Sequence, residues 1–169
     1  RRSLALPGDE HLKELGHITA NFSLLEASLT FIVWRLIPSD AAIIITEGMS
    51  FRRLVDLFRR LANHQTKDTH ARKQIRAWCK RAEKAAQRRN EMLHSMWTFD
   101  DTGSRVPGTL AMRGSLRGIS EREVLENIQA TSVRELDEIA LEIFATAVAL
   151  HRLKLPVTPV WRRCSTANG

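Results

Sequence analysis

Residues 21–37 read NFSLLEASLTFIVWRLI, and the spacing of their side chains predicts a helix. The predicted inner stripe recurs at alternating intervals of four and three residues: Phe22, Glu26, Leu29, Val33 and Leu36. This is the period of one face of an α-helix. The pattern predicts a helix from about Asp9 to Leu36 that ends near Pro38, with Glu26 as the one charged member of an otherwise apolar stripe.

The rest of the chain divides into further helical segments joined by polar turns. In order, these are a short apolar segment from a Ser39 or Asp40 cap to Ile45, a helix after a Ser50 cap, a helix from about Asp68 to Trp97, and a last helix after a Thr131 or Ser132 cap. Four glycines and a proline in residues 98–119 prevent the third long helix from continuing.

These segments predict an all-α fold, an up-and-down bundle of about four main helices. A small β-hairpin or flap is expected to be inserted before the last helix, over about residues 98–130. We expect a single domain over 1–169, with its core in about 10–153 and a loose tail at 154–169.

Positive charge is concentrated in the middle of the chain. The net charge is +7, but residues 52–89 hold thirteen Lys or Arg against three acids, whereas residues 120–153 hold seven acids against three Arg. A basic middle favours a polyanionic partner such as RNA, although most charge runs are solvated helix faces.

Composition favours a cytoplasmic protein. No apolar run approaches the roughly 20 residues that cross a bilayer, so we expect no membrane partner. The opening RRSLALPGDE has no apolar core typical of a signal peptide. Cys79 and Cys164 have neither a disulfide framework nor metal-ligand spacing, which suits a reducing compartment.

Residues 87–97, QRRNEMLHSMW, place an arginine in the apolar stripe of the third long helix. That stripe again alternates intervals of four and three: Ile75, Cys79, Ala82, Ala86, Arg89, Leu93 and Met96. Arg89 therefore stands where an apolar residue is expected. Because an unpaired buried charge is costly, we expect Glu26 to pair with Arg89 and orient it.

Asn90 and His94 lie one turn apart and share a face of this helix, one step round from Arg89. A histidine can take the proton of a ribose 2′-hydroxyl, or deliver one to the leaving 5′-oxygen, because its pKa lies near neutrality. An arginine can stabilise the charge that develops on the phosphate. These residue types suit RNA cleavage without a metal.

The run RRNEMLHSMW (88–97) resembles the motif of the HEPN superfamily (higher eukaryotes and prokaryotes nucleotide-binding domains), in which an arginine, a polar residue and three more residues precede a histidine. Arg89, Asn90 and His94 fill these places, and Arg88 offers an alternative register. The stretches NFSLLEASLTFIVWRLI and GMSFRRLVDLFRRLA are similar to small bacterial members.

The resemblance implies a homodimer whose two motifs share a composite cleft, and a metal-independent endoribonuclease that leaves a 2′,3′-cyclic phosphate and a 5′-hydroxyl. It needs no cofactor. His94 would be the general acid or base, Arg89 the transition-state stabiliser and Asn90 a positioning group. It also implies a toxin or antiphage-defence component, with a separate antitoxin or partner protein.

Other side chains of the third helix are candidate RNA contacts: Arg81, Lys84, Gln87, Arg88 and Trp97. Two alternatives remain open. One is a dimer that binds RNA, a nucleotide or a protein without catalysis. The other is a di-iron carboxylate site, built from two Glu-x-x-His pairs and two single glutamates: Glu14, His17, Glu91, His94, Glu47 and Glu142.

Overall fold

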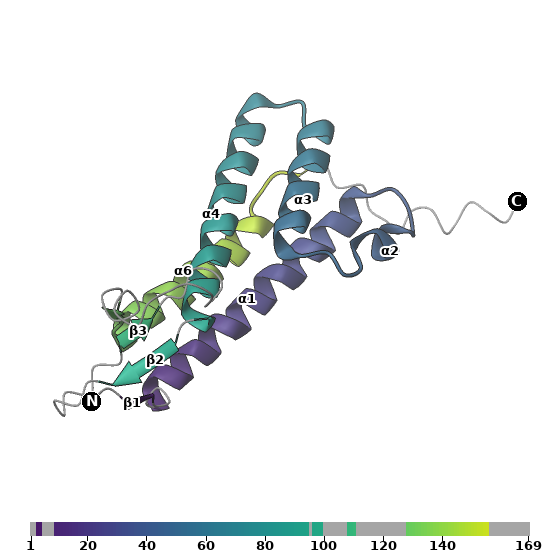
Figure 1. Ribbon diagram of the computed structural model, residues 1–169. Helices are drawn as coiled ribbons and strands as arrows, with labels where there is room; N and C mark the ends of the chain where they lie inside the picture. Colours follow the sequence, from purple (N-terminus) through teal and green to yellow (C-terminus); the bar gives the residue numbers. More distant parts are fainter. Residues whose placement is uncertain (1–2, 5–8, 95, 100–107, 111–127, 156–169) are drawn as a thin grey trace, which may run out of the picture. The chain divides into compact units, whose positions relative to one another are not determined.

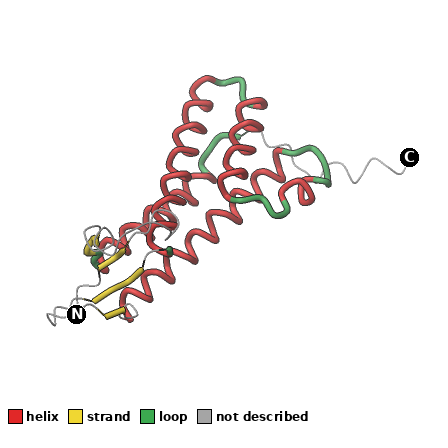
Figure 2. The backbone as a smooth tube through the Cα atoms, in the orientation of Figure 1, coloured by secondary structure: helices red, strands yellow, loops and turns green. Residues whose placement is uncertain are grey.

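A computed structural model gives the structure of the chain and describes residues 3–4, 9–94, 96–99, 108–110 and 128–155. The described part is predominantly helical, as predicted (Figure 2). Its helices are α1 (Asp9–Leu36), α2 (Ala42–Thr46), α3 (Phe51–Gln65), α4 (Thr69–Leu93) and α6 (Val133–His151).

Four short strands form a small antiparallel sheet in the order β1-β2-β3-β4. They are β1 (Ser3–Leu4), β2 (Met96–Phe99), β3 (Gly108–Leu110) and β4 (Ile128–Ala130). The hairpin or flap predicted for residues 98–130 falls largely on 100–107 and 111–127, which lie outside the described residues, as do residues 156–169 of the predicted tail.

The chain divides into two compact units. The first unit comprises residues 1–22 and 85–144, and the second comprises residues 23–84 and 145–169. Each unit therefore contains a part of α1, α4 and α6. The single domain and the single bundle expected from the sequence stay predictions.

The predicted first helix is confirmed at both ends, since α1 runs from Asp9 to Leu36. Its apolar stripe is buried, and Glu26 is half-buried. The helix α6 begins where the sequence places it, because the Ser132 hydroxyl accepts the backbone N–H of Glu135 at 3.2 Å. Such a bond satisfies one of the free N–H groups of a first helical turn.

The caps of the two middle segments differ in detail from the prediction. Ser50 is the N-cap of α3 but makes no side-chain cap hydrogen bond there. The N-cap of α2 is Ala41, not Ser39 or Asp40. The Ser39 hydroxyl instead accepts the N–H of Ala41 at 3.2 Å. A serine hydroxyl can bond the backbone two residues on, which shifts the helix start by one or two positions.

The end predicted for the third long helix is wrong. It was expected to reach Trp97, but α4 ends at Leu93 and Met96–Phe99 form β2. Trp97 pairs with Thr109 of β3, and Thr98 pairs with Leu4 of β1. Aromatic and β-branched residues favour strands once a partner is present, and this pairing outweighs the helical spacing.

In the second unit, α3 and the described part of α4 up to Lys84 lie side by side and antiparallel (Figure 1). Phe58 and Trp78 pack edge to face, with ring centroids 5.2 Å apart. The Trp78 indole N–H donates to the backbone oxygen of Thr146 at 2.9 Å, so the ring is fixed at both its apolar and its polar end. These contacts set the spacing between α3 and α4.

In the first unit, the Asn21 side-chain amide of α1 donates to the backbone oxygen of Ala140 on α6 at 3.0 Å. The apolar core around this bond is formed by Ile18, Leu136, Ile139 and Ile143. Among the described residues, no helix is both long and apolar enough to span a membrane.

Phe58→Ala should lower the free energy of unfolding by about 3 to 5 kcal/mol, because the ring is fully buried and its loss leaves a cavity. Urea denaturation followed by circular dichroism measures this. Phe31→Ala is the matched control, since Phe31 is 60% exposed and only packs edge to face on Trp34. The control should cost about 1 kcal/mol or less. Equal losses in the two variants would contradict this assignment of the core.

Candidate functional site

Arg89 lies on the last full turn of α4, in the first unit. Its guanidinium carbon stands 5.1 Å from the centre of the Phe22 ring on α1. Its Nη1 donates to the Asn90 side-chain oxygen at 2.9 Å, and its Nε is buried without a hydrogen-bond partner. The aromatic face attracts the cation without neutralising its charge. Arg89 is therefore positioned while it keeps the capacity to bind an anion.

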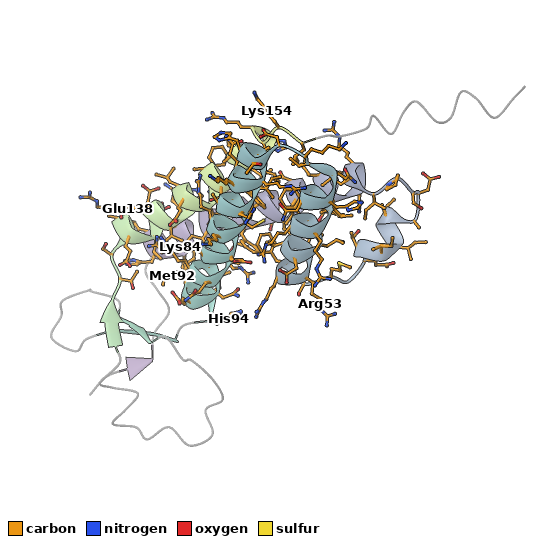
Figure 3. The ribbon with its side chains drawn as sticks, turned by 90° about the horizontal axis from the view of Figure 1, so that it is seen from above. Arg53, Lys84, Met92, His94, Glu138 and Lys154 are labelled. Atoms are coloured by element: carbon orange, nitrogen blue, oxygen red, sulfur yellow. The ribbon has the colours of Figure 1, made fainter. Side chains whose placement is uncertain are left out.

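His94 follows the last residue of α4 and is exposed (Figure 3). Its backbone N–H donates to the backbone oxygen of Asn90 at 3.0 Å. This bond has the spacing of an α-helix and fixes the backbone at the helix end. The imidazole has no hydrogen-bond partner among the residues that the structure describes. The histidine is thus placed within one turn of Asn90, in solvent, where it can exchange protons.

Arg88 differs from its neighbour because it is paired. Its Nη1 donates to the carboxylate of Glu142 on α6 at 2.6 Å, and the two side chains are only 30% and 28% exposed. The bond ties the end of α4 to α6 within the first unit. Of the two registers of the motif, Arg89 is therefore the one whose charge no carboxylate in the described part of the chain engages.

The pairing of Arg89 with Glu26 stays a prediction, since Glu26 belongs to the second unit. The residue that sequence reasoning missed is Phe22, one turn before Glu26 on the same stripe. The sequence did contain a signal for this contact. Phe22 lies on the same stripe as Glu26, and an aromatic ring is an alternative to a carboxylate as the partner of an arginine. Glu142 was also missed as the partner of Arg88, since pairs distant in sequence carry no local pattern.

The other residues predicted to contact RNA lie on different elements of the structure. Gln87 donates to the Glu91 side chain at 2.8 Å, along the surface of α4. Arg81 and Lys84 are exposed on the part of α4 that belongs to the second unit. Trp97 lies in β2, not in the helix. Their roles as RNA contacts stay predictions.

The carboxylates of the di-iron alternative are used in other ways. Glu14 accepts from His17 Nδ1 at 3.1 Å. Glu142 is paired with Arg88, and Glu91 is bonded by Gln87. In the described part of the chain, no three metal-ligating side chains come close enough to hold an ion. The arrangement supplies a positioned cation and an exposed imidazole in place of a carboxylate cage.

Cys79 is a buried thiol on the core side of α4. Burial raises its pKa, and the neighbouring Arg59 guanidinium acts in the opposite direction. A thiol must ionise to act as a nucleophile, so Cys79 stays protonated at neutral pH and lies outside the candidate site.

No family model matches the chain, and neither a curated protein nor a solved structure matches it. Its function is therefore inferred from its own residues and their contacts.

Replacement of each motif arginine should separate a structural from a functional role. Arg88→Gln removes one partner of a half-buried ion pair and should lower the free energy of unfolding by about 1 to 3 kcal/mol. Arg89→Gln loses only the stacking on Phe22 and the bond to Asn90, and should cost about 1 kcal/mol or less. Urea denaturation measures both. A larger loss for Arg89→Gln than for Arg88→Gln would make Arg89 a structural residue.

Proposed function

We propose that the chain is a metal-independent endoribonuclease of the HEPN type, with Arg89, Asn90 and His94 as its catalytic residues. The observation that carries the proposal is the state of Arg89. Its guanidinium is stacked on Phe22 and bonded to the neutral amide of Asn90, and an exposed histidine follows five residues after it in the sequence. A charge held in place without a counterion can bind a phosphate.

The proposed step uses the RNA itself as the nucleophile. The 2′-oxygen attacks the adjacent phosphorus while its proton passes to a base, and the bond from phosphorus to the 5′-oxygen breaks as that oxygen gains a proton. The products are a 2′,3′-cyclic phosphate and a 5′-hydroxyl. His94 takes one of these proton transfers, since an imidazole changes charge near neutral pH. The nucleophile is a hydroxyl of the substrate, so this step requires no metal-bound water.

Arg89 is proposed to stabilise the negative charge that grows on the phosphate oxygens. Asn90 accepts a hydrogen bond from Arg89 and so holds the guanidinium at the end of the helix. Because Nε is buried and Nη1 is bonded to Asn90 through one N–H, Nη2 and the second N–H of Nη1 are the donors that can contact two phosphate oxygens.

A second copy of the chain is proposed to complete the site. A catalytic base is ordinarily oriented by a neighbouring group, and His94 has no such neighbour in the described part of a single chain. A homodimer with a composite cleft, which the family resemblance also implies, supplies that group and the second proton carrier. A role as a toxin or defence component, with a separate antitoxin, rests on the resemblance alone.

The alternative is a dimer that binds RNA, a nucleotide or a protein without cutting. One observation favours it: the exposed, unoriented imidazole of His94 is also what a surface residue without a catalytic role would show. The two functions differ in whether covalent bonds of RNA are broken.

Cleavage in EDTA tests the proposal. A pooled panel of tRNA and mRNA is incubated with the wild type, with His94→Ala, and with His151→Ala. His151 is the matched control, because it is also an exposed histidine at the end of a helix. The wild type and His151→Ala should give fragments with 2′,3′-cyclic phosphate and 5′-hydroxyl ends. Loss of the acid–base group in His94→Ala should slow cleavage by about 100-fold or more.

Other end chemistry, or unchanged cleavage by His94→Ala, would contradict the proposal. Absence of cleavage by folded, dimeric wild type, together with retained RNA binding, would favour the non-catalytic alternative. Circular dichroism of each variant shows whether a loss of cleavage reflects a loss of folding.

A further inference from the structure

The basic residues of α3 and α4 in the second unit fall into two groups. The first group is bonded within the fold. Arg72 donates to the backbone oxygen of Thr66 at 2.6 Å and so holds the turn between the helices. Arg59 is paired with Asp56 and with Glu83. Arg59 thereby pairs with the acidic residue of α3, Asp56, and with the acidic residue in the second-unit part of α4, Glu83.

The second group is exposed and has no carboxylate partner among the described residues. Six of its members are Arg52, Arg53 and Arg60 on α3, and Lys73, Arg76 and Lys80 on α4; Arg81 also belongs to it but lies on the other flank of α4. Six cations with no counterion of their own repel one another, and this repulsion is relieved when a polyanion binds.

We name these six side chains the basic face. Lys73, Arg76 and Lys80 follow one another on α4 at intervals of three and four, and Arg53 and Arg60 lie two turns apart on α3, so each set shares a face of its helix. The pair of Arg59 with Glu83 shows that these flanks of α3 and α4 meet. Arg52 lies two turns before Arg59, and Arg76 lies two turns before Glu83, so each shares the flank of its partner in the pair. Because the helices are antiparallel and Phe58 lies against Trp78, the rise per residue places Arg52 and Arg76 about 12 Å apart along the helix axes.

The helices that carry the basic face are held in place by contacts within the unit. The contact of Phe58 with Trp78 fixes the distance between the helices, and the carboxylate of Asp68 accepts the backbone N–H groups of His70 and Ala71 at 2.9 and 3.3 Å at the start of α4. A surface that is ordered before binding loses less conformational entropy when a ligand binds.

The chemistry of the face selects the kind of polyanion. In the described part of the chain, none of the large exposed apolar residues lies on α3 or α4, and the aromatic rings Phe58 and Trp78 are buried. Without exposed apolar side chains the face cannot insert into a lipid surface. Without exposed aromatic rings it cannot stack unpaired bases. It offers cations, and the contacts that cations make with phosphates carry no sequence information.

We propose that the basic face binds the phosphate backbone of double-stranded segments of RNA, independently of sequence. It rests on the proposed function only in taking RNA as the polyanion, and none of its six residues belongs to the catalytic motif. A span of about 12 Å passes about three to four base pairs, given about 3.4 Å of duplex axis for each phosphate of one strand. Structured RNA is therefore the substrate class that this surface recruits.

Binding of a fluorescent 20-base-pair RNA hairpin, measured by anisotropy at several salt concentrations, tests this proposal. The test variant is Lys73→Ala/Arg76→Ala/Lys80→Ala. The control variant Arg35→Ala/Arg152→Ala/Lys154→Ala removes the same charge from exposed residues outside the face. Figure 3 shows Arg53 of the face and Lys154 on opposite sides of this unit.

The test variant should bind about ten-fold or more weakly at physiological salt, and its slope of log affinity against log salt should fall by about two to three. The control variant should keep the wild-type slope to within about one. Equal losses in both variants would overturn the basic face, as would tighter binding of a single-stranded RNA of equal charge. Equal binding of wild type to anionic phospholipid vesicles would overturn the choice of RNA.

A second readout separates this inference from the proposed function. A dinucleotide has one phosphate, at the bond that is cut, so it cannot span the basic face. The test variant should therefore cleave it at the wild-type rate, whereas His94→Ala should bind the hairpin normally. Loss of dinucleotide cleavage by the folded test variant would overturn a pure docking role. Normal hairpin binding without any cleavage would support the basic face and contradict the ribonuclease.

Discussion

A guanidinium stacked on an aromatic ring is the constraint on which the candidate site depends. Arg89 interrupts the apolar stripe of α4, and the ring of Phe22 covers it at 5.1 Å. A carboxylate in that place would neutralise the arginine and compete with a phosphate. The ring attracts the cation but leaves its hydrogen-bond donors and its net charge in place. The same last turn of α4 carries Asn90, and the helix ends at Leu93, one residue before His94.

Neighbouring arginines differ in role because they contact different partners. Arg88 is next to Arg89 in sequence, yet it is bonded to Glu142 and ties α4 to α6. Arg59 similarly engages two carboxylates of the second unit, whereas six cations around it stay in solvent. The paired arginines connect neighbouring helices, and the arginines without a carboxylate partner are the ones proposed to bind RNA. This separation accounts for a basic middle segment that contributes both to the structure and to the proposed binding of RNA.

Local patterns predicted the parts of the fold that local forces determine. The bounds of α1 and the start of α6 follow from apolar spacing, Pro38 and the Ser132 cap. The end of α4 could not be predicted in the same way, because Met96 and Trp97 fit a helical stripe and enter β2 only through pairing with distant strands. Sequence spacing put Arg89 on the stripe and missed Phe22, whose ring lies 5.1 Å from the guanidinium, while the pairing with Glu26 stays a prediction. The side chain that an arginine meets depends on packing between helices, which residue types alone do not specify.

The central claim is that the 2′-hydroxyl of the RNA is the nucleophile at the Arg89–Asn90–His94 motif. Two oligonucleotides that differ only in the 2′-hydroxyl of the nucleotide before the cut test it, in single-turnover cleavage with EDTA present. The account predicts that the all-ribose strand is cut at that position and that the strand with the single deoxyribose is not. Cleavage of both strands at that position would show that another nucleophile acts, and cleavage of neither would remove the catalytic role assigned to the motif.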